Sequence, residues 1–156
     1  MRVISLQTAS ALTGRSERTL WRRVSDRSLL RGPDDLRGRA MLDLESVAPM
    51  LLVQLTSQDL GVLQLADAGD AEAQNDIALL FLEAGRAESA KYLFEMAAKQ
   101  GHPDAMHWLG RCAIEGNGTE KDTTLGLSWL TRAAAAGHVI SREMVESLVS
   151  GALKAK

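Results

Sequence analysis

The residues with the clearest chemical capacity in this chain are arginines concentrated near its start. The first 40 residues hold nine arginines against four carboxylates, a net charge of +5. A guanidinium group donates paired hydrogen bonds to a phosphate or to the edge of a guanine, so basic clustering on a helix is the usual electrostatic footprint of DNA binding. The candidate DNA-contact residues are Arg15, Ser16, Arg18, Thr19, Arg22, Arg23, Arg37 and Arg39.

The charge reverses farther along the chain. Residues 41–100 hold ten carboxylates against three basic residues, a net charge of −7, and the remaining residues balance at six of each. Opposite charge blocks indicate two modules with different partners. The whole chain is mildly acidic at −2, and Asp34 and Asp35 lie among the candidate contacts. DNA binding and a basic surface that faces solvent or protein therefore both stay open as hypotheses.

Histidine and cysteine do not form a catalytic or metal-binding pattern. His102 and His138 each follow a glycine directly, which indicates turn residues, and His107 does not share a helix face with His102. No spaced carboxylates or cysteines join them, so no metal site is expected. Cys112 lacks any reactive motif and is interpreted as a packing residue. With no phosphate loop, carboxylate pair or triad signature either, the chain is expected not to be an enzyme and to need no cofactor.

The sequence also favours a cytoplasmic location without membrane insertion. A single cysteine rules out an internal disulfide and is typical of intracellular proteins. The N-terminus has no apolar core of a signal peptide, and no apolar run approaches the roughly 20 residues that a membrane helix needs.

The second half of the chain contains a repeated unit. The run Gly69–Ala73 aligns with Gly101–Ala105, and each run leads into an apolar helical stretch, a turn with glycine and an alanine-rich helix. From Gly69 to Gly101 the spacing is 32 residues, and from Gly101 to Gly137 it is 36. A repeat of this length predicts stacked helical hairpins with a continuous core and an extended binding surface.

The second copy resembles the Sel1-like repeat, a relative of the tetratricopeptide repeat. The matching residues are Ala105, Leu109, Gly110, Gly116, Gly118, Asp122, Trp129, Ala133, Ala134 and Gly137. The first copy keeps the small and apolar positions but lacks the turn with two glycines. This resemblance implies an all-α repeat solenoid that binds a protein partner and does not catalyse a reaction.

The basic N-terminal stretch has the pattern of two short helices around a turn at Gly14. Ser5 and Ser16 are suited to cap the first and second helix, and Leu20 and Val24 form the buried stripe of the second. This is the layout of a helix-turn-helix.

The stretch from Ala9 to Arg22 resembles the winged helix-turn-helix of excisionases and MerR-type regulators. The resemblance implies wing strands at Leu29–Arg31 and Arg39–Leu44, with the wing tip at Asp34–Gly38. It also implies that the second helix enters the major groove of double-stranded DNA. The protein is then expected to bind as a homodimer, because a single helix of this size reads too few base pairs for useful specificity.

Three segments follow from these patterns. They are a winged helix-turn-helix at residues 1–45, connecting or capping helices at 46–68, and repeats with a C-terminal capping helix at 69–156. The chain is predicted to be mainly all-α, with a two-stranded wing at about residues 29–42. The predicted helices are 5–13, 16–25, 44–56, 58–67, 71–84, 86–100, 102–115, 122–136 and 141–153.

The three tryptophans differ in their expected roles. Trp129 occupies the tryptophan position of the repeat and is predicted in the core, and Trp21 is predicted to be half-buried. Trp108 is either a core residue or an exposed anchor for a partner. The residues proposed for partner contact on the repeat surface are Asp76, Met106, Trp108, Arg111 and Glu115.

These features together predict a cytoplasmic bacterial regulatory protein. Its repeats dock a protein partner, and its basic helix docks double-stranded DNA. The alternative is an interaction adaptor without DNA binding, in which the winged helix serves dimerisation or partner contact. A scaffold of an envelope or motility system, acting from the cytoplasmic side, is a third hypothesis.

Overall fold

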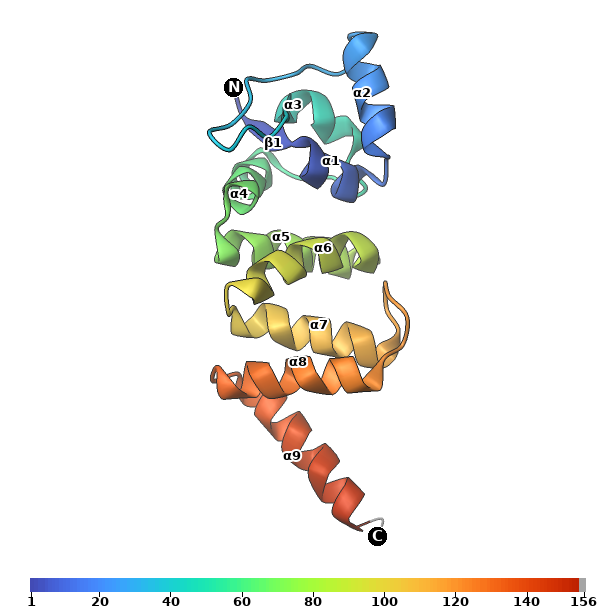
Figure 1. The fold of residues 1–156 in the computed structure, drawn as a ribbon, viewed down its shortest axis with the longest axis vertical. Helices are drawn as coiled ribbons and strands as arrows, with labels where there is room; N and C mark the ends of the chain where they lie inside the picture. The colour runs from blue at the N-terminus through green and yellow to red at the C-terminus, as the bar shows by residue number, and fades with distance from the viewer. Residues whose placement is uncertain (155–156) are drawn as a thin grey trace.

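The chain forms an elongated stack of helices with a small mixed unit at its N-terminal end (Figure 1). This computed structural model describes residues 1–154. In chain order the elements are β1 (Val3–Ser5), α1 (Leu6–Thr13), α2 (Glu17–Ser25), β2 (Met41–Asp43), α3 (Leu44–Val47), the 3-10 helix η1 (Ala48–Met50), α4 (Ser57–Ala68), α5 (Ala71–Glu83), α6 (Ala87–Lys99), α7 (Pro103–Glu115), α8 (Thr123–Ala135) and α9 (Val139–Lys154). The predicted mainly helical class is confirmed.

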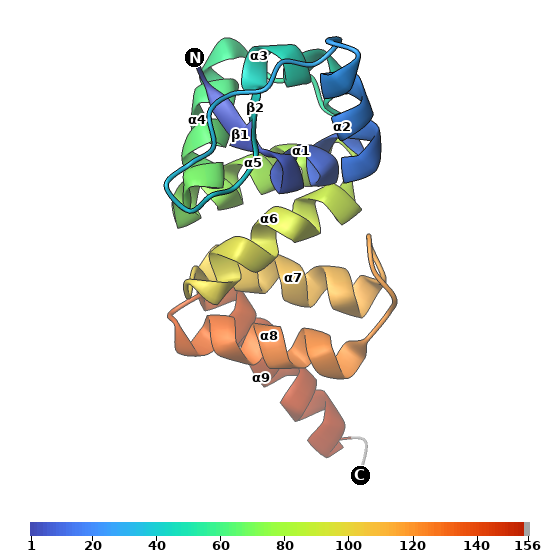
Figure 2. The same ribbon diagram turned by 45° about the horizontal axis from the view of Figure 1, so that its top comes forward.

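Two helical hairpins, α5–α6 and α7–α8, make up the repeats, and Figure 2 shows them as successive layers. α4 packs on the first hairpin and α9 on the second. The first helix of each hairpin begins at a side chain that accepts a backbone N–H, Asp70 from Ala73 at 2.8 Å and His102 from Ala105 at 3.3 Å. Such caps satisfy N–H groups that the first turn of a helix leaves free.

Glycine sets the distance between the two helices of the second hairpin. A Cβ on Gly110 would lie 2.8 Å from Cγ of Leu130, and one on Gly126 would lie 2.5 Å from Cγ1 of Ile114. Both distances are shorter than a van der Waals contact, so α7 and α8 approach closely only because these positions lack side chains. The packing requirement explains the Leu-Gly pair of the repeat pattern.

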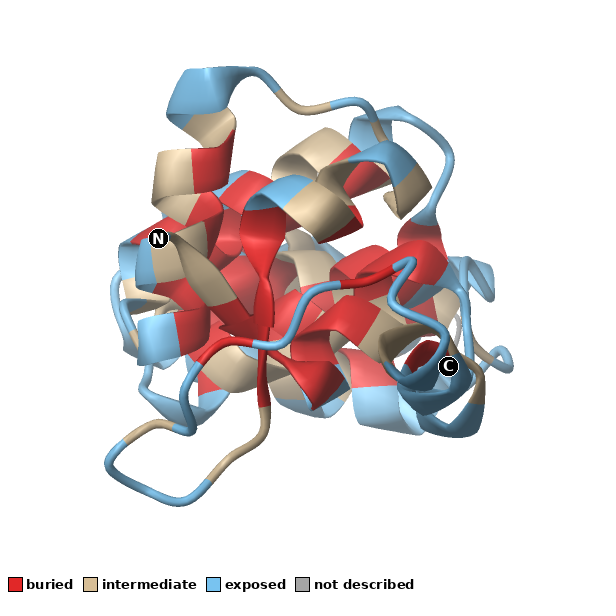
Figure 3. Cartoon of the chain, turned by 90° about the horizontal axis from the view of Figure 1, so that it is seen from above, coloured by how far each residue is buried: buried red, intermediate tan, exposed pale blue. Residues whose placement is uncertain are grey.

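The core runs through the whole stack. Its largest fully buried side chains in the repeats include Ile77, Phe81, Leu93, Phe94 and Leu130. Seen from the N-terminal end, buried residues fill the centre and exposed residues lie on the peripheral loops (Figure 3). A continuous core of this kind is how neighbouring repeats stabilise each other.

A buried polar network connects the N-terminal unit, which runs from β1 to η1, to the repeats. The carboxylate of Asp67, at the end of α4 and 3% exposed, accepts hydrogen bonds from the Ser5 backbone N–H at 2.9 Å, the Ser5 hydroxyl at 2.6 Å and the Thr8 hydroxyl at 2.5 Å. The hydroxyls of Thr8 and Tyr92, on α6, are 3.1 Å apart. Burial raises the pKa of Tyr92 above its usual value. The network joins β1 and α1 to α4 and the first repeat.

The predicted wing pairs differently from expectation. β2 forms an antiparallel two-stranded sheet with β1, in which Ile4 lies opposite Leu42. Leu29–Arg31 is not a strand and contributes one bridge, between Arg31 and Leu42. The β-branched Val3 and Ile4 favour a strand. In the Arg31 segment the Gly32 N–H still donates to the Met41 carbonyl oxygen at 2.9 Å, and the pairing ends at Pro33, which has no N–H to donate.

The helix predicted at 44–56 is too long. The structure has α3, then η1, and the chain becomes extended at Leu51. Pro49 cannot donate an N–H to a carbonyl in the preceding turn, so the α-helix does not continue through it. The Leu52 N–H instead donates to the Leu12 carbonyl oxygen at 3.0 Å, which holds this segment against α1. Each of the other predicted helices begins and ends within two residues of the corresponding helix among residues 1–154 of the structure.

Candidate functional site

The helix α2 presents a basic face to solvent. Its N-cap is Ser16, which accepts the Thr19 N–H at 3.2 Å, and Leu20 anchors the helix with no exposed surface. Arg15, Arg18 and Arg22 are exposed. Arg18 and Arg22 are four residues apart and so lie on one side of α2, whereas Arg15 precedes the N-cap in the turn from α1. Thr19 and Arg23 are partly buried beside them.

Within residues 1–154, no carboxylate forms an ion pair with Arg15, Arg18, Arg22 or Arg23. These four guanidinium groups are therefore not engaged in ion pairs. Hydrogen bonds from Ser28 lower the pKa of the Asp26 carboxylate, at the end of α2, and the nearby charges of Arg23 and Arg22 lower it further. Such a surface has the chemistry to bind phosphates or carboxylates.

The two arginines of the loop before β2 have different environments. Arg37 is exposed. Arg39 is only partly exposed, pairs with Asp35 through Nε at 2.7 Å and lies 3.7 Å from the Asp67 carboxylate. This pairing weighs against DNA contact by Arg39, because its charge is already engaged by two carboxylates of the protein.

Asp35 has a structural role that its sequence position did not reveal. Its carboxylate accepts the backbone N–H groups of Arg37 at 3.0 Å and Arg39 at 2.8 Å, which closes the loop. These hydrogen bonds, led by the one from the Arg39 backbone, hold the pKa of Asp35 below its usual value. Its charge is thus engaged by its own loop and by Arg39, whereas Asp34 pairs with Arg31 at 2.7 Å.

The residues proposed for partner contact on the repeats are not all on the surface. Asp76 and Glu115 are exposed. Trp108 is partly buried, with the Arg111 guanidinium 5.3 Å from the ring centroid, and Arg111 pairs with Glu115 at 3.1 Å. Met106 is 3% exposed and belongs to the core, so the expectation that it contacts a partner is corrected. Its helix position faces the interior of the stack.

The tryptophans also depart in part from expectation. Trp129 is partly buried at the edge of the core, and the Arg132 guanidinium covers its ring at 4.5 Å from the centroid. The prediction that Trp129 lies in the core is met in part, because its ring packs against the core cluster but keeps some exposed surface. Trp21 is 36% exposed, with Arg31 at 5.3 Å from its ring centroid.

His102 and His138 occupy equivalent positions of the two repeats, and each contacts a carboxylate at the start of an earlier helix. His102 Nε2 lies 2.8 Å from the Glu72 carboxylate, and His138 Nε2 lies 3.1 Å from that of Asp104. Nδ1 of His138 accepts the Ser141 N–H at 3.1 Å, as His102 does at the start of α7. The two histidines do lie in turns, as predicted. Each also caps the helix that follows it and connects that helix to an earlier one.

His107 lies behind this second histidine. It is 3% exposed, stacks on His138 with 4.3 Å between the ring centroids, and its Nδ1 lies 2.8 Å from the Ser141 hydroxyl. Burial, with smaller contributions from His138 and Arg111, lowers the pKa of His107 to about 4. The neutral imidazole is therefore part of the contact between α7 and α9.

We expect this histidine to make stability depend on acid. The unfolded chain takes up the proton near pH 6.5 but the folded chain only near pH 4, so the free energy of unfolding should fall as the pH drops through this window. The loss should approach about 3 kcal/mol and level off below pH 4. Urea unfolding from pH 7 to pH 4 would measure it. His107→Gln should flatten the dependence, and identical slopes for both proteins would contradict the assignment.

Neither a metal centre nor a membrane span is found among the residues that the structure covers. No group of three or more His, Cys, Asp or Glu side chains in residues 1–154 is arranged to hold an ion. None of the described helices is long and apolar enough to cross a bilayer. Cys112 is 4% exposed, and burial raises the pKa of its thiol, so the side chain behaves as a packing group.

Comparison with known proteins agrees with the two hairpins. The model of the family described as Sel1 repeat matches residues 71–102 and 103–138, which are α5–α6 and α7–α8 with their following turns. The crystal structure of a Sel1 repeat protein from Oxalobacter formigenes is 32% identical, with a TM-score of 0.53, and the match covers 58% of this chain and 71% of that one. A search of curated proteins found no match.

The chain belongs to the Sel1-repeat family.

The Sel1 repeats indicate a role in protein–protein interaction, and the comparisons indicate no catalytic family. Both matched segments lie after residue 70, so they leave the N-terminal unit outside. The comparisons therefore give no support for DNA contact or a regulatory role, and both stay predictions that depend on the N-terminal unit.

Sequence reasoning missed one basic residue that the structure brings close to α2. Arg86 precedes α6 and shares a cavity with Arg15. Its signal in the sequence was only a lone arginine in an acidic segment, beside the helix-ending Gly85. Sequence spacing gave no sign that the turn between α5 and α6 lines the same cavity as the turn between α1 and α2.

Proposed function

We propose that the chain is a cytoplasmic regulatory protein whose Sel1 repeats dock a protein partner and whose helix α2 docks double-stranded DNA as a homodimer. The observation that supports DNA contact most is the unpaired, exposed group of Arg15, Arg18 and Arg22. α1 and α2 are joined by a short turn at Gly14, as in a helix-turn-helix, and α1 packs on the repeats through the Asp67 network.

In this arrangement α2 would lie in the major groove, with Ser16 and Thr19 near its leading end. Arg18 and Arg22 would reach phosphates or guanine edges, while Arg23 and Arg37 would follow the backbone. A dimer doubles the number of base pairs that one short helix can read.

The proposed DNA contact predicts a measurable loss in two variants. Arg18→Ala and Arg22→Ala should each weaken binding to a fluorescent duplex, because each removes a charge from the basic face. A lost phosphate contact should also lower the salt slope of binding by about one unit. Fluorescence anisotropy at two salt concentrations measures both effects, and sedimentation of the complex measures the dimer.

Arg132→Ala is the matched control, since Arg132 is an exposed arginine on α8 far along the stack from α2. It should bind the duplex like the unmodified protein. Equal and weak binding by the α2 variants, the control and the unmodified protein would reject DNA contact by this helix.

A protein adaptor without DNA binding is the second candidate, and exposed apolar residues favour it. Trp21, Leu30 and Leu36 are exposed on the N-terminal unit, at 36%, 54% and 108%. An exposed aromatic side chain such as that of Trp21 is the kind of residue that anchors protein contacts. On the repeats, the exposed Asp76 and Glu115 and the stacked Trp108 and Arg111 are the proposed partner contacts in either case.

A further inference from the structure

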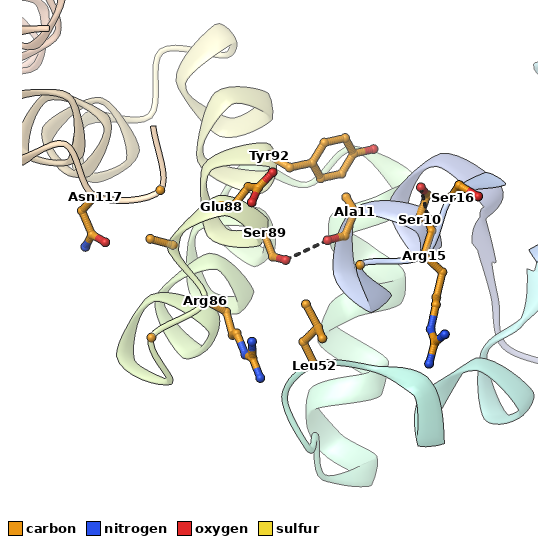
Figure 4. Close-up of a pocket in the computed structure, with 14 residues that line it drawn as sticks. Ser10, Ala11, Arg15, Ser16, Leu52, Arg86, Glu88, Ser89, Tyr92 and Asn117 are labelled. Atoms are coloured by element: carbon orange, nitrogen blue, oxygen red, sulfur yellow. Dashed lines mark hydrogen bonds between the residues drawn. The ribbon is translucent and has the colours of Figure 1, made fainter. Parts of the chain in front are cut away.

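A polar cavity of about 730 Å³ lies where the N-terminal unit meets the repeats, and we call it the junction groove. Three turns converge on it, those between α1 and α2, between α5 and α6, and between α7 and α8 (Figure 4). The residues that contribute most to its chemistry are Arg15, Leu52, Arg86, Glu88, Ser89 and Tyr92.

The longer loop of the second repeat forms one wall of the junction groove. Asn117 and Gly118 line it, and a Cβ on Gly118 would lie 2.6 Å from both the carbonyl carbon of Ala87 and the nitrogen of Glu88. Gly118 also has a φ of +72°, which favours glycine. The loop is therefore seated on the start of α6, so the turn with two glycines that distinguishes this repeat has a defined place.

The opposite wall is fixed to the repeats by hydrogen bonds. The Ser89 hydroxyl on α6 donates to the Ala11 carbonyl oxygen on α1 at 2.8 Å, as Figure 4 shows. The Ser10 hydroxyl donates to the Arg15 carbonyl oxygen at 2.7 Å, which holds the turn that carries this arginine. A groove whose walls are held in place costs little conformational entropy when a ligand binds.

The junction groove carries positive charge from both units of the chain. The side chains of Arg15 and Arg86 extend on either side of Leu52 (Figure 4). Both are exposed, and neither forms an ion pair in the described part of the chain. Glu88 is the one acidic side chain among the lining residues. Two guanidinium groups with an apolar residue between them match an acidic segment that also carries an apolar side chain.

We propose that the junction groove binds an acidic segment of a partner protein, with carboxylates paired to Arg15 and Arg86 and an aliphatic side chain on Leu52. The proposal rests on the protein-docking part of the proposed function and gives it a site and a partner chemistry. The cavity volume lies within the range of about 300–1,000 Å³ found for small-ligand pockets. A recess of this size can hold a short peptide.

The test uses the full chain and a fluorescein-labelled peptide with glutamates on both sides of a central leucine. Fluorescence anisotropy should show binding that disappears when glutamine replaces each glutamate. Arg15→Gln and Arg86→Gln should each weaken binding about tenfold, the effect of losing one charge-assisted hydrogen bond. Glu88→Gln should tighten binding, because it removes the acidic group from the groove.

Arg22→Gln is the matched control, since Arg22 belongs to the same N-terminal unit as Arg15 but does not line the junction groove. It should leave peptide affinity unchanged, and thermal melting should confirm that every variant folds. An unchanged affinity for Arg86→Gln, or an equal loss for Arg22→Gln, overturns the proposal. Weaker duplex binding by Arg86→Gln with unchanged peptide binding would instead assign the groove to nucleic acid. The Arg18 and Arg22 variants test DNA contact separately, so the two failures are distinguishable.

Discussion

Phe94→Ala should lower the free energy of unfolding by about 3–5 kcal/mol, as large aromatic truncations in packed cores do. The Phe94 side chain, on α6, has no exposed surface and belongs to the core cluster. Its removal leaves a cavity that stacked helices fill only in part. Urea unfolding monitored by circular dichroism would measure the loss.

Trp129→Ala is the informative comparison for this prediction. Its ring is partly buried and covered by Arg132, so the expected cost is only about 1–2 kcal/mol. A cost equal to that of Phe94→Ala would contradict the marginal position of Trp129. It would also restore the interpretation that the repeat pattern suggested, with this tryptophan in the core.

The helices of the repeats could be predicted because residues close to each helix end determine where the helix begins and stops. Gly69, Gly101 and Gly137 each follow a helix with a positive φ. Asp70 and Asp122 provide capping side chains at the next helix start. These signals lie within a few residues of the boundary they set, so sequence spacing is enough to find them.

The N-terminal unit was harder to predict because its structure depends on distant pairing. β1 and β2 are three-residue strands almost forty residues apart, too short to leave a periodic pattern. The loop with Asp34 and Asp35 looked like an acidic obstacle to DNA. The Asp35 carboxylate instead accepts hydrogen bonds from backbone N–H groups of its own loop. Composition reports which charges are present, whereas only the fold shows which of them are paired.

The same limit applies to the candidate site residues. Arg39 and Arg22 have the same chemistry in the sequence, yet Arg39 pairs with Asp35 and Arg22 has no ion-pair partner in residues 1–154. Met106 and Trp108 are two residues apart on α7, so they point about 200° apart around the helix and only one of them reaches the surface. Without the orientation of α7 in the stack, sequence reasoning had no basis for choosing between them.

Asp67→Ala should be as destabilising as the loss of a core aromatic, by about 3–5 kcal/mol. The substitution leaves the Ser5 N–H, the Ser5 hydroxyl and the Thr8 hydroxyl without their acceptor in a buried place. Arg39 also loses the nearby carboxylate. Urea unfolding would give the total cost, and hydrogen exchange would show where it falls.

The cost of Asp67→Ala should be concentrated at the junction between the two units. Exchange protection should fall in β1 and α1, which Asp67 holds, and persist in α7 and α8, none of whose residues accepts from or donates to Asp67 in the described part of the chain. Asp67→Asn is the matched control, because the amide oxygen still accepts hydrogen bonds and the loss should be about 1–2 kcal/mol. A uniform loss of protection along the chain would mean that the stack unfolds as one cooperative unit. Loss confined to β1 and α1 would mean that this one carboxylate holds the basic helix in place against the repeats, and with it the alignment of Arg15 and Arg86 in the junction groove.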